Sequence, residues 1–100
     1  NYLISLGHEI IERNWRTKLC EIDIVSKKAD TIYFTEVKHR KNDKGGDGFA
    51  AITKKKQHQM AFAARLFAHR HQLEGVCDLR LAALATAGEH PVVTQFVEIL

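Results

Sequence analysis

The sequence predicts an α/β protein with one mixed central sheet flanked by helices, and three observations lead to this fold class. Short runs rich in apolar and β-branched residues recur before residue 40 and after residue 76, as expected for strands. Between these runs, residues 50–72 change to a helical period. The chain has 100 residues, of which 45% are hydrophobic, so it can build one small core. We therefore expect a single domain.

The first part of the chain is expected to form a short helix and then a three-strand antiparallel meander. Glycine often ends a helix, and Gly7 follows a short apolar run that resembles a last helical turn. The third strand is the clearest of the three because β-branched and aromatic residues dominate it. The expected elements are a helix over residues 2–6, strands over residues 8–16, 19–26 and 31–39, and a turn over residues 27–30.

The second part is expected to contain one long helix and two more strands. Met60, Ala63, Ala64 and Phe67 follow the i, i+3, i+4, i+7 spacing that marks the buried face of a helix. The elements expected around this helix are a solvated, glycine-rich loop over residues 40–48, strands over residues 76–85 and 92–100, and a turn over residues 88–91.

Composition narrows the classes of function. The formal net charge is +3, which agrees with a nucleic-acid partner. No apolar run approaches the roughly 20 residues of a membrane span, so no membrane partner is expected. Cys20 and Cys77 lack metal-ligand spacing and are expected to be reduced thiols of a cytoplasmic protein. The histidines show no zinc spacing, and no glycine-rich phosphate loop is present.

Two motifs on the second and third expected strands carry most of the chemical information. Glu21 and Asp23 are two positions apart, as are Glu36 and Lys38, and such residues share one face of a strand. A hairpin would therefore bring three carboxylates and one ammonium group together. Crowded carboxylates repel each other unless a cation lies among them, and oxygen ligands suit Mg²⁺ or Mn²⁺. The pattern indicates a site typical of phosphodiesterases.

A simpler interpretation is a solvated strand face with ordinary cross-strand ion pairs. Against it, the same expected face carries the apolar residues Val25, Ile32 and Phe34. The charges then lie at the end of a buried stripe, which is unusual for a purely solvated face. Both interpretations remain open from the residues alone.

Lysines cluster at the start of the long helix. Adjacent ammonium groups repel one another and oppose the helix dipole. The run is either a solubilising surface or a phosphate contact that also uses the free N–H groups of the helix N-terminus. The candidate nucleic-acid contacts, which we call the basic rim, are Arg40, Lys41, Lys44, Lys54 and Lys55.

Residues 7–16, 21–25 and 34–40 resemble the YraN family of small bacterial proteins, and so do residues 51–53 together with 56 and 57. The resemblance covers about residues 2–85. This family is similar in fold to the PD-(D/E)xK nucleases, which include Holliday-junction resolvases and restriction enzymes. The resemblance implies a restriction-endonuclease-like fold and one nuclease-like domain over residues 1–100, with part of its N-terminal helix upstream of this sequence.

The resemblance also implies roles for individual residues. Asp23 and Glu36 correspond to the metal-binding and catalytic carboxylates, and Lys38 corresponds to the catalytic lysine. The carbonyl of Val37 is expected as a further metal ligand. Glu21 is left open between the same ion, a second ion and a salt bridge. The residues expected as accessories of the site are Glu21, Lys56 and Gln57.

The expected function is metal-dependent hydrolysis of phosphodiester bonds in DNA or structured nucleic acid, with Mg²⁺ or Mn²⁺ as cofactor. DNA is favoured over RNA as the partner. Two alternatives stay open: a non-catalytic nucleic-acid-binding module of the same fold, and an accessory protein that acts through a protein partner. The oligomeric state is also open, with a homodimer as one option.

Overall fold

The computed structural model describes residues 2–18, 20–40, 53–73, 75–88 and 92–98. Gly7 follows the first helix with φ of +94°, the left-handed conformation that favours glycine, so the predicted helix end is confirmed. The elements are α1 (Tyr2–Ser5), β1 (Glu9–Arg16), β2 (Glu21–Lys28), β3 (Thr31–Arg40), α2 (Lys54–Arg70), β4 (Asp78–Ala87) and β5 (Val92–Glu98).

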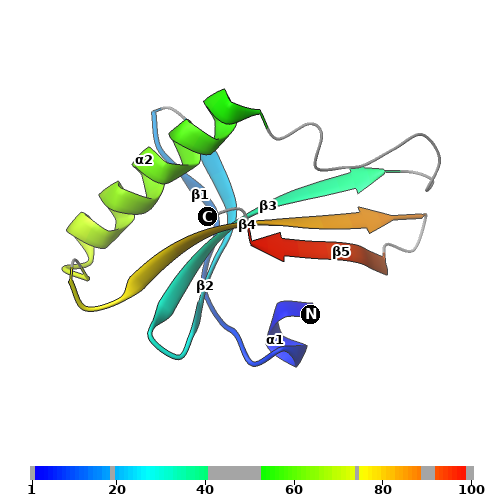
Figure 1. The fold of residues 1–100 in the computed structure, drawn as a ribbon, viewed down its shortest axis with the longest axis horizontal. Coiled ribbons are helices and arrows are strands. Elements are labelled where there is room, and N and C mark those ends of the chain that lie inside the picture. Colours follow the sequence, from blue (N-terminus) through cyan, green and yellow to red (C-terminus); the bar gives the residue numbers. More distant parts are fainter. Residues whose placement is uncertain (1, 19, 41–52, 74, 89–91, 99–100) are drawn as a thin grey trace.

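The strands form one mixed sheet in the order β1-β2-β3-β4-β5 (Figure 1). The first three strands form an antiparallel meander, β3 and β4 are parallel, and β5 is antiparallel to β4. A parallel pair needs a long crossover, and here the chain between β3 and β4 contains α2. The predicted α/β class with a mixed central sheet is therefore confirmed, and it agrees with a restriction-endonuclease-like fold.

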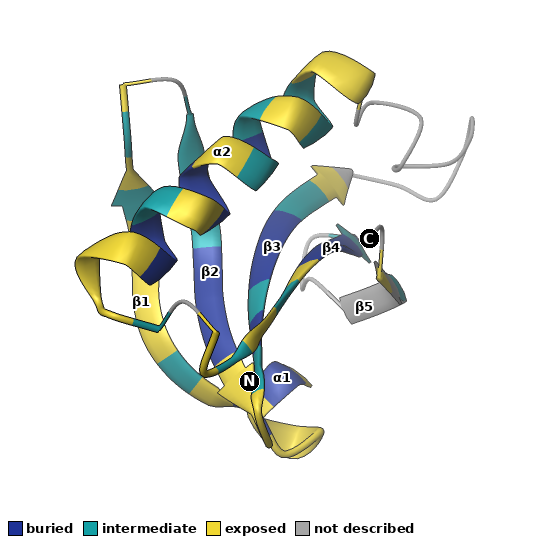
Figure 2. Cartoon of the chain, turned by 60° about the vertical axis from the view of Figure 1, so that its left-hand side comes forward, coloured by how far each residue is buried: buried dark blue, intermediate teal, exposed yellow. Residues whose placement is uncertain are grey.

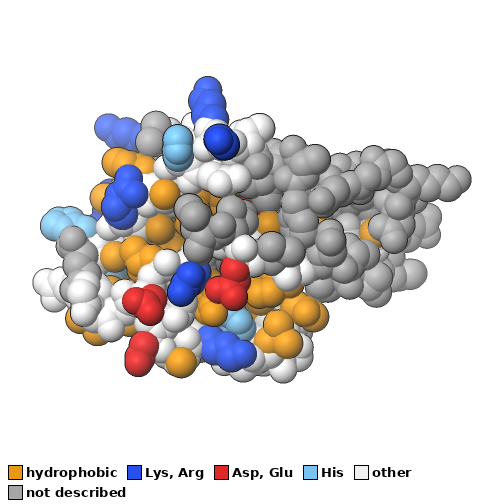
Figure 3. Space-filling view, viewed as in Figure 1, with side chains coloured by type: hydrophobic (Ala, Val, Ile, Leu, Met, Phe, Trp, Pro, Cys, Tyr) orange, Lys and Arg blue, Asp and Glu red, His pale blue; other side chains and the backbone are white. Residues whose placement is uncertain are grey.

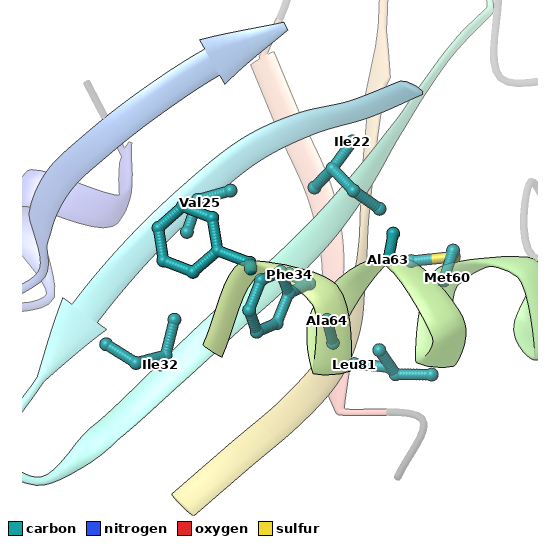
Figure 4. Packing of buried hydrophobic residues seen from close by; sticks show 9 residues of the cluster. Ile22, Val25, Ile32, Phe34, Met60, Ala63, Ala64 and Leu81 are labelled. Atoms are coloured by element: carbon teal, nitrogen blue, oxygen red, sulfur yellow. The ribbon is translucent and has the colours of Figure 1, made fainter. Parts of the chain in front are cut away.

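The hydrophobic core lies between α2 and one face of the sheet (Figure 4). Figure 2 shows the buried side of α2 turned toward the strands and its exposed side turned away. Phe67 lies at the centre, with ring centroids 5.3 Å from Trp15 and 5.6 Å from Phe34. The predicted helix face is confirmed. The buried cluster consists of Ile22, Val25, Ile32, Phe34, Met60, Ala63, Ala64, Phe67 and Leu81.

β2 does not keep a regular alternation of side chains. Ile22 and Val25 are three residues apart, yet both belong to the cluster under α2. In a regular strand, residues three apart point to opposite faces. The alternation is therefore broken between them, in the segment that contains Asp23.

β2 and β3 also separate at this point. Their ladder runs from Lys28 and Thr31 to Ile24 and Thr35 and ends there, whereas β3 stays paired with β4 along its whole length. Figure 1 shows the two strands diverging. Because the strands separate here, side chains from β2 and α2 reach the segment around Glu36.

No helix among the described residues is both long enough and apolar enough to cross a membrane. This agrees with the absence of any long apolar run in the sequence.

Candidate functional site

Asp23 bridges the opening between β2 and β3. Its Oδ2 accepts a hydrogen bond of 2.8 Å from the backbone N–H of Val37. The carboxylate therefore serves as an acceptor for β3 where the backbone ladder has ended. Because Val37 directly follows Glu36, this bond holds the carboxylates of Asp23 and Glu36 next to each other.

Glu36 is the buried member of the pair, with 8% of its surface exposed. Burial raises the pKa of its carboxyl group, and the adjacent carboxyl of Asp23 raises it further through a hydrogen bond and through its charge. The ammonium group of Lys56 acts in the opposite direction but does not cancel these effects. A group that is buried, charged and beside a like charge is typical of functional sites.

Lys56 neutralises part of this charge. Its Nζ lies 3.1 Å from Oε2 of Glu36, and both side chains are largely shielded from solvent. Lys56 is held in the first turn of α2 by Thr53, the N-cap residue, whose hydroxyl accepts the backbone N–H of Lys56 at 3.1 Å. Since the first turn of α2 contains no acidic residue, Glu36 from β3 supplies the negative charge that a helix N-terminus favours.

Lys38 lies two residues beyond Glu36 on β3 and is half-buried. In the parallel register, Glu36 is opposite Ala83 and Lys38 is opposite Ala85. The neighbouring strand therefore places only methyl groups beside these two charged side chains. The spacing keeps the ammonium group on the side of β3 that carries Glu36.

Glu21 does not join the other carboxylates. Its Oε2 forms a salt bridge of 2.8 Å with Nε of Arg16, its cross-strand partner on β1. The expectation that three carboxylates meet is therefore wrong, because Glu21 pairs with β1 whereas Asp23 reaches toward β3. Of the three roles left open for Glu21, the structure shows the salt bridge.

Among the described residues, no group of three or more His, Cys, Asp or Glu side chains is arranged to hold a metal ion.

The remaining predicted residues lie around the start of α2 or outside the residues that the structure describes. Lys54 and Lys55 are exposed in the first turn, and Gln57 is half-buried one residue beyond Lys56. The parts of the basic rim that lie outside the described residues are the side chain of Arg40 and the whole of Lys41 and Lys44.

Two carboxylates and a backbone carbonyl fit the needs of Mg²⁺ or Mn²⁺. Mg²⁺ commonly binds proteins through one or two carboxylates and completes its shell with water and substrate phosphate oxygens. Asp23 and Glu36 converge, and the carbonyl of Val37 is adjacent in the chain. The raised pKa of Glu36 means that a further cation would relieve the repulsion between the two carboxylates.

Thr53 is not among the residues predicted for the site, although its hydroxyl holds the backbone of Lys56 in place. A signal for it exists, because threonine directly before a helical period is a common N-cap. The ion pair between Lys56 and Glu36 has no comparable local signal. It depends on the position of α2 over the sheet, which follows from the crossover to β4.

Glu36→Gln is expected to leave the free energy of unfolding at pH 7 unchanged or to raise it. A carboxyl group whose pKa is higher in the folded state binds its proton more tightly there, so stability is lost as the pH rises through the unfolded and then the folded pKa. The amide carries no charge and avoids this loss. The difference between variant and wild type should shrink below pH 4.5, the usual glutamate pKa, where the carboxyl is protonated in both states.

Chemical unfolding of both proteins from pH 4 to pH 8 measures this difference. Glu21→Gln is the matched control, since it removes an exposed ion pair that contributes little. A large loss of stability in Glu36→Gln at pH 7 would mean that the ion pair with Lys56 outweighs the repulsion from Asp23.

Known proteins with related sequences identify the family. A model described as "Uncharacterised protein family UPF0102" matches residues 1–86. A UPF0102 protein of Herminiimonas arsenicoxydans is 36% identical over 83 residues, which cover 83% of this chain and 67% of the relative. One of Sulfurihydrogenibium sp. is 37% identical over 87 residues, covering 87% of this chain and 75% of the relative.

A UPF0102 protein of Leptospira interrogans is 48% identical over 67 residues, which cover 67% of this chain and 58% of the relative. The chain thus aligns with somewhat more than half to three quarters of the length of these relatives. These matches confirm the resemblance carried by the Glu-Ile-Asp and Glu-Val-Lys motifs. The chain belongs to the uncharacterised protein family UPF0102, the YraN family.

Proposed function

We propose that this protein is a metal-dependent nuclease that hydrolyses phosphodiester bonds of nucleic acid, with DNA as the favoured substrate. The observation that carries the proposal is the pair of adjacent carboxylates, Asp23 and Glu36, at the point where β2 and β3 separate. Two lysines, Lys38 and Lys56, come from β3 and α2 beside this pair. Acidic groups for a cation and ammonium groups for a phosphate are what this chemistry requires.

Each residue has a defined part in this proposal. Asp23 and Glu36 would hold Mg²⁺ or Mn²⁺, which supplies Lewis-acid activation of the phosphate and a more acidic bound water. Lys38 offsets the negative charge that develops on the phosphoryl oxygens, or orients the attacking water. Lys56 neutralises Glu36 in the metal-free protein and is free to contact a phosphate oxygen when that carboxylate binds a cation.

A second candidate function is nucleic-acid binding without cleavage. The ion pair between Lys56 and Glu36 favours it, because the buried carboxylate already has a cationic partner 3.1 Å away. In such a protein, the charged cluster would stabilise the fold and the basic rim would bind phosphates. The two functions differ in their need for a divalent cation.

Metal binding and cleavage assays separate the two candidates. Calorimetric titration with Mn²⁺ should show a site that disappears in Asp23→Asn. Labelled single strands, duplexes, flaps and junctions incubated with Mg²⁺ or Mn²⁺ should show cleavage of at least one substrate. Binding of these substrates without cleavage in either metal would favour the binding module.

Nucleic-acid binding is expected to weaken steeply with salt. Each neutralised phosphate contributes a slope of roughly −0.9 to log K against log salt on duplex DNA. Replacing Lys54 and Lys55 together with alanine should reduce the slope by up to about two units, because both are exposed at the start of α2. Fluorescence anisotropy at four salt concentrations measures the slope.

The matched control replaces Lys27 and Lys28 with alanine. These lysines are also adjacent and exposed, but they lie at the other end of β2 from Asp23. Their loss should leave the slope near that of the wild type. Equal effects from both pairs would mean that binding is spread over the surface instead of being concentrated at the start of α2.

A further inference from the structure

The outer face of α2 carries a row of basic residues interrupted by an exposed aromatic ring. Within α2, the helical residues include three lysines, two arginines and two histidines but no acidic residue. Figure 3 shows blue and pale-blue side chains over this helix with orange patches between them. Five of its exposed residues are alternately three and four positions apart, so they share one face of the helix. They are Lys55, His58, Phe62, Arg65 and His69.

A groove lies beside this row, between α2 and the turn that joins β1 to β2. It has a volume of about 330 Å³, and Thr17, Lys18, Phe62, Leu66 and Arg70 line it. Its apolar part comes from Phe62 and Leu66, and two of its walls carry positive charge. Phe62 is 43% exposed, although phenylalanine is usually buried.

The groove and the basic rim meet on one face of α2. Lys55 belongs to the basic rim at the start of α2, and Phe62 lies seven residues further on the same face. Seven residues are about two helical turns, or about 10 Å. A nucleic-acid strand that leaves the site can therefore follow α2 and meet the exposed ring.

We propose that this groove binds an unpaired nucleotide of the substrate, whose base stacks on Phe62 while Lys18 and Arg70 bind the neighbouring phosphates. An exposed aromatic ring between cations is the arrangement that proteins use to bind single strands without regard to sequence. Charge complementarity supports a polyanion as the occupant. The proposal rests on the proposed function and narrows its substrate class.

The substrate class follows from what the ring can reach. Bases inside a duplex are stacked on their neighbours and do not offer a free face to a side chain, whereas unpaired bases do. The favoured substrate is therefore a nucleic acid with a single-stranded segment next to the scissile bond, such as a flap or an overhang, and not a blunt duplex.

The test compares binding of a blunt duplex with binding of the same duplex carrying a single-stranded overhang, by fluorescence anisotropy in the Asp23→Asn background. Phe62→Ala should weaken binding to the overhang substrate by roughly 10-fold, since stacking on one base commonly contributes that much. Binding to the blunt duplex should stay unchanged. Phe62→Trp should restore binding to the overhang, because the larger ring also stacks.

Ile11→Ala is the matched control, because Ile11 is also an exposed apolar residue but lies on β1, away from the groove. Thermal melting of each variant checks that the fold is kept. If the protein binds both substrates equally and Phe62→Ala does not change this binding, the inference is overturned and the nuclease proposal still stands. No binding to any nucleic acid overturns both. If Phe62 is needed to bind a polyglutamate peptide but not to bind nucleic acid, the groove is a protein-docking site and the proposal is contradicted.

Discussion

Asp23→Asn is expected to abolish most cleavage while the protein stays fully folded. The side-chain amide oxygen of asparagine still accepts the N–H of Val37, so the link across the opening between β2 and β3 is kept. The negative charge beside Glu36 is lost, which lowers the pKa of that carboxyl group. Because one of the two proposed metal-binding carboxylates is gone, the cleavage rate should fall by roughly 10²–10³-fold, the range for losing one group that stabilises transition-state charge.

Asp23→Ala separates the structural role of Asp23 from its proposed chemical role. It removes the same carboxylate but also leaves the N–H of Val37 without its acceptor, at a cost of about 1–3 kcal/mol if that group stays away from water. Cleavage should be lost in both variants, and stability only in the alanine variant. Urea unfolding and single-turnover cleavage of the two proteins measure this.

Two results would contradict this account of Asp23. Cleavage by Asp23→Asn at near the wild-type rate would exclude the residue as a metal-binding carboxylate. Equal loss of stability in both variants would mean that the negative charge, and not the hydrogen bond to Val37, supports the fold.

Much of the fold could be predicted because local periodicity and burial agree. The apolar spacing from Met60 to Phe67 is long enough to define a helix face, and the structure buries the same residues under the helix. The β-branched and aromatic run after residue 31 forms β3. In both segments the local preference of the chain and its place in the core lead to the same element.

The site was predictable only in part because it lies where β2 stops being regular. The rule that residues two apart share a face predicts that Glu21 and Asp23 project together. The two carboxylates nevertheless have partners on opposite sides of β2, because Glu21 pairs with Arg16 of β1 while Asp23 bonds to the backbone of β3. The bond of Asp23 lies where the ladder between β2 and β3 has ended, and no local sequence pattern records the end of that ladder.

The start of α2 shows how a conflict with local preference can indicate a site. Three lysines in the first turn oppose the helix dipole, and a helix chosen for stability alone would carry acidic residues there. The structure resolves part of the conflict by placing Glu36 of β3 against Lys56. Departures from local rules that are compensated from elsewhere in the chain are expected at functional sites.

Lys38 is expected to affect turnover far more than affinity. Lys38 lies two residues after Glu36 on β3, and only alanines are opposite these two residues on β4. Its ammonium group can therefore approach a phosphate held at the carboxylate pair. An interaction that strengthens as charge develops lowers the barrier without tightening ground-state binding by the same amount. Lys38→Ala should reduce the cleavage rate by about 10²-fold or more, while the dissociation constant changes much less.

The shape of the cation adds a second, sharper test of this role. Lys38→Arg keeps the charge but replaces a compact ammonium group with a planar guanidinium, so it should restore little of the lost rate. Lys27→Ala is the control, because Lys27 is exposed at the far end of β2. Single-turnover cleavage beside a binding titration on one substrate gives both quantities. If Lys38→Ala cleaves at near the wild-type rate, the charge that stabilises the transition state must come from elsewhere, and Lys56, already 3.1 Å from Glu36, becomes the residue to test.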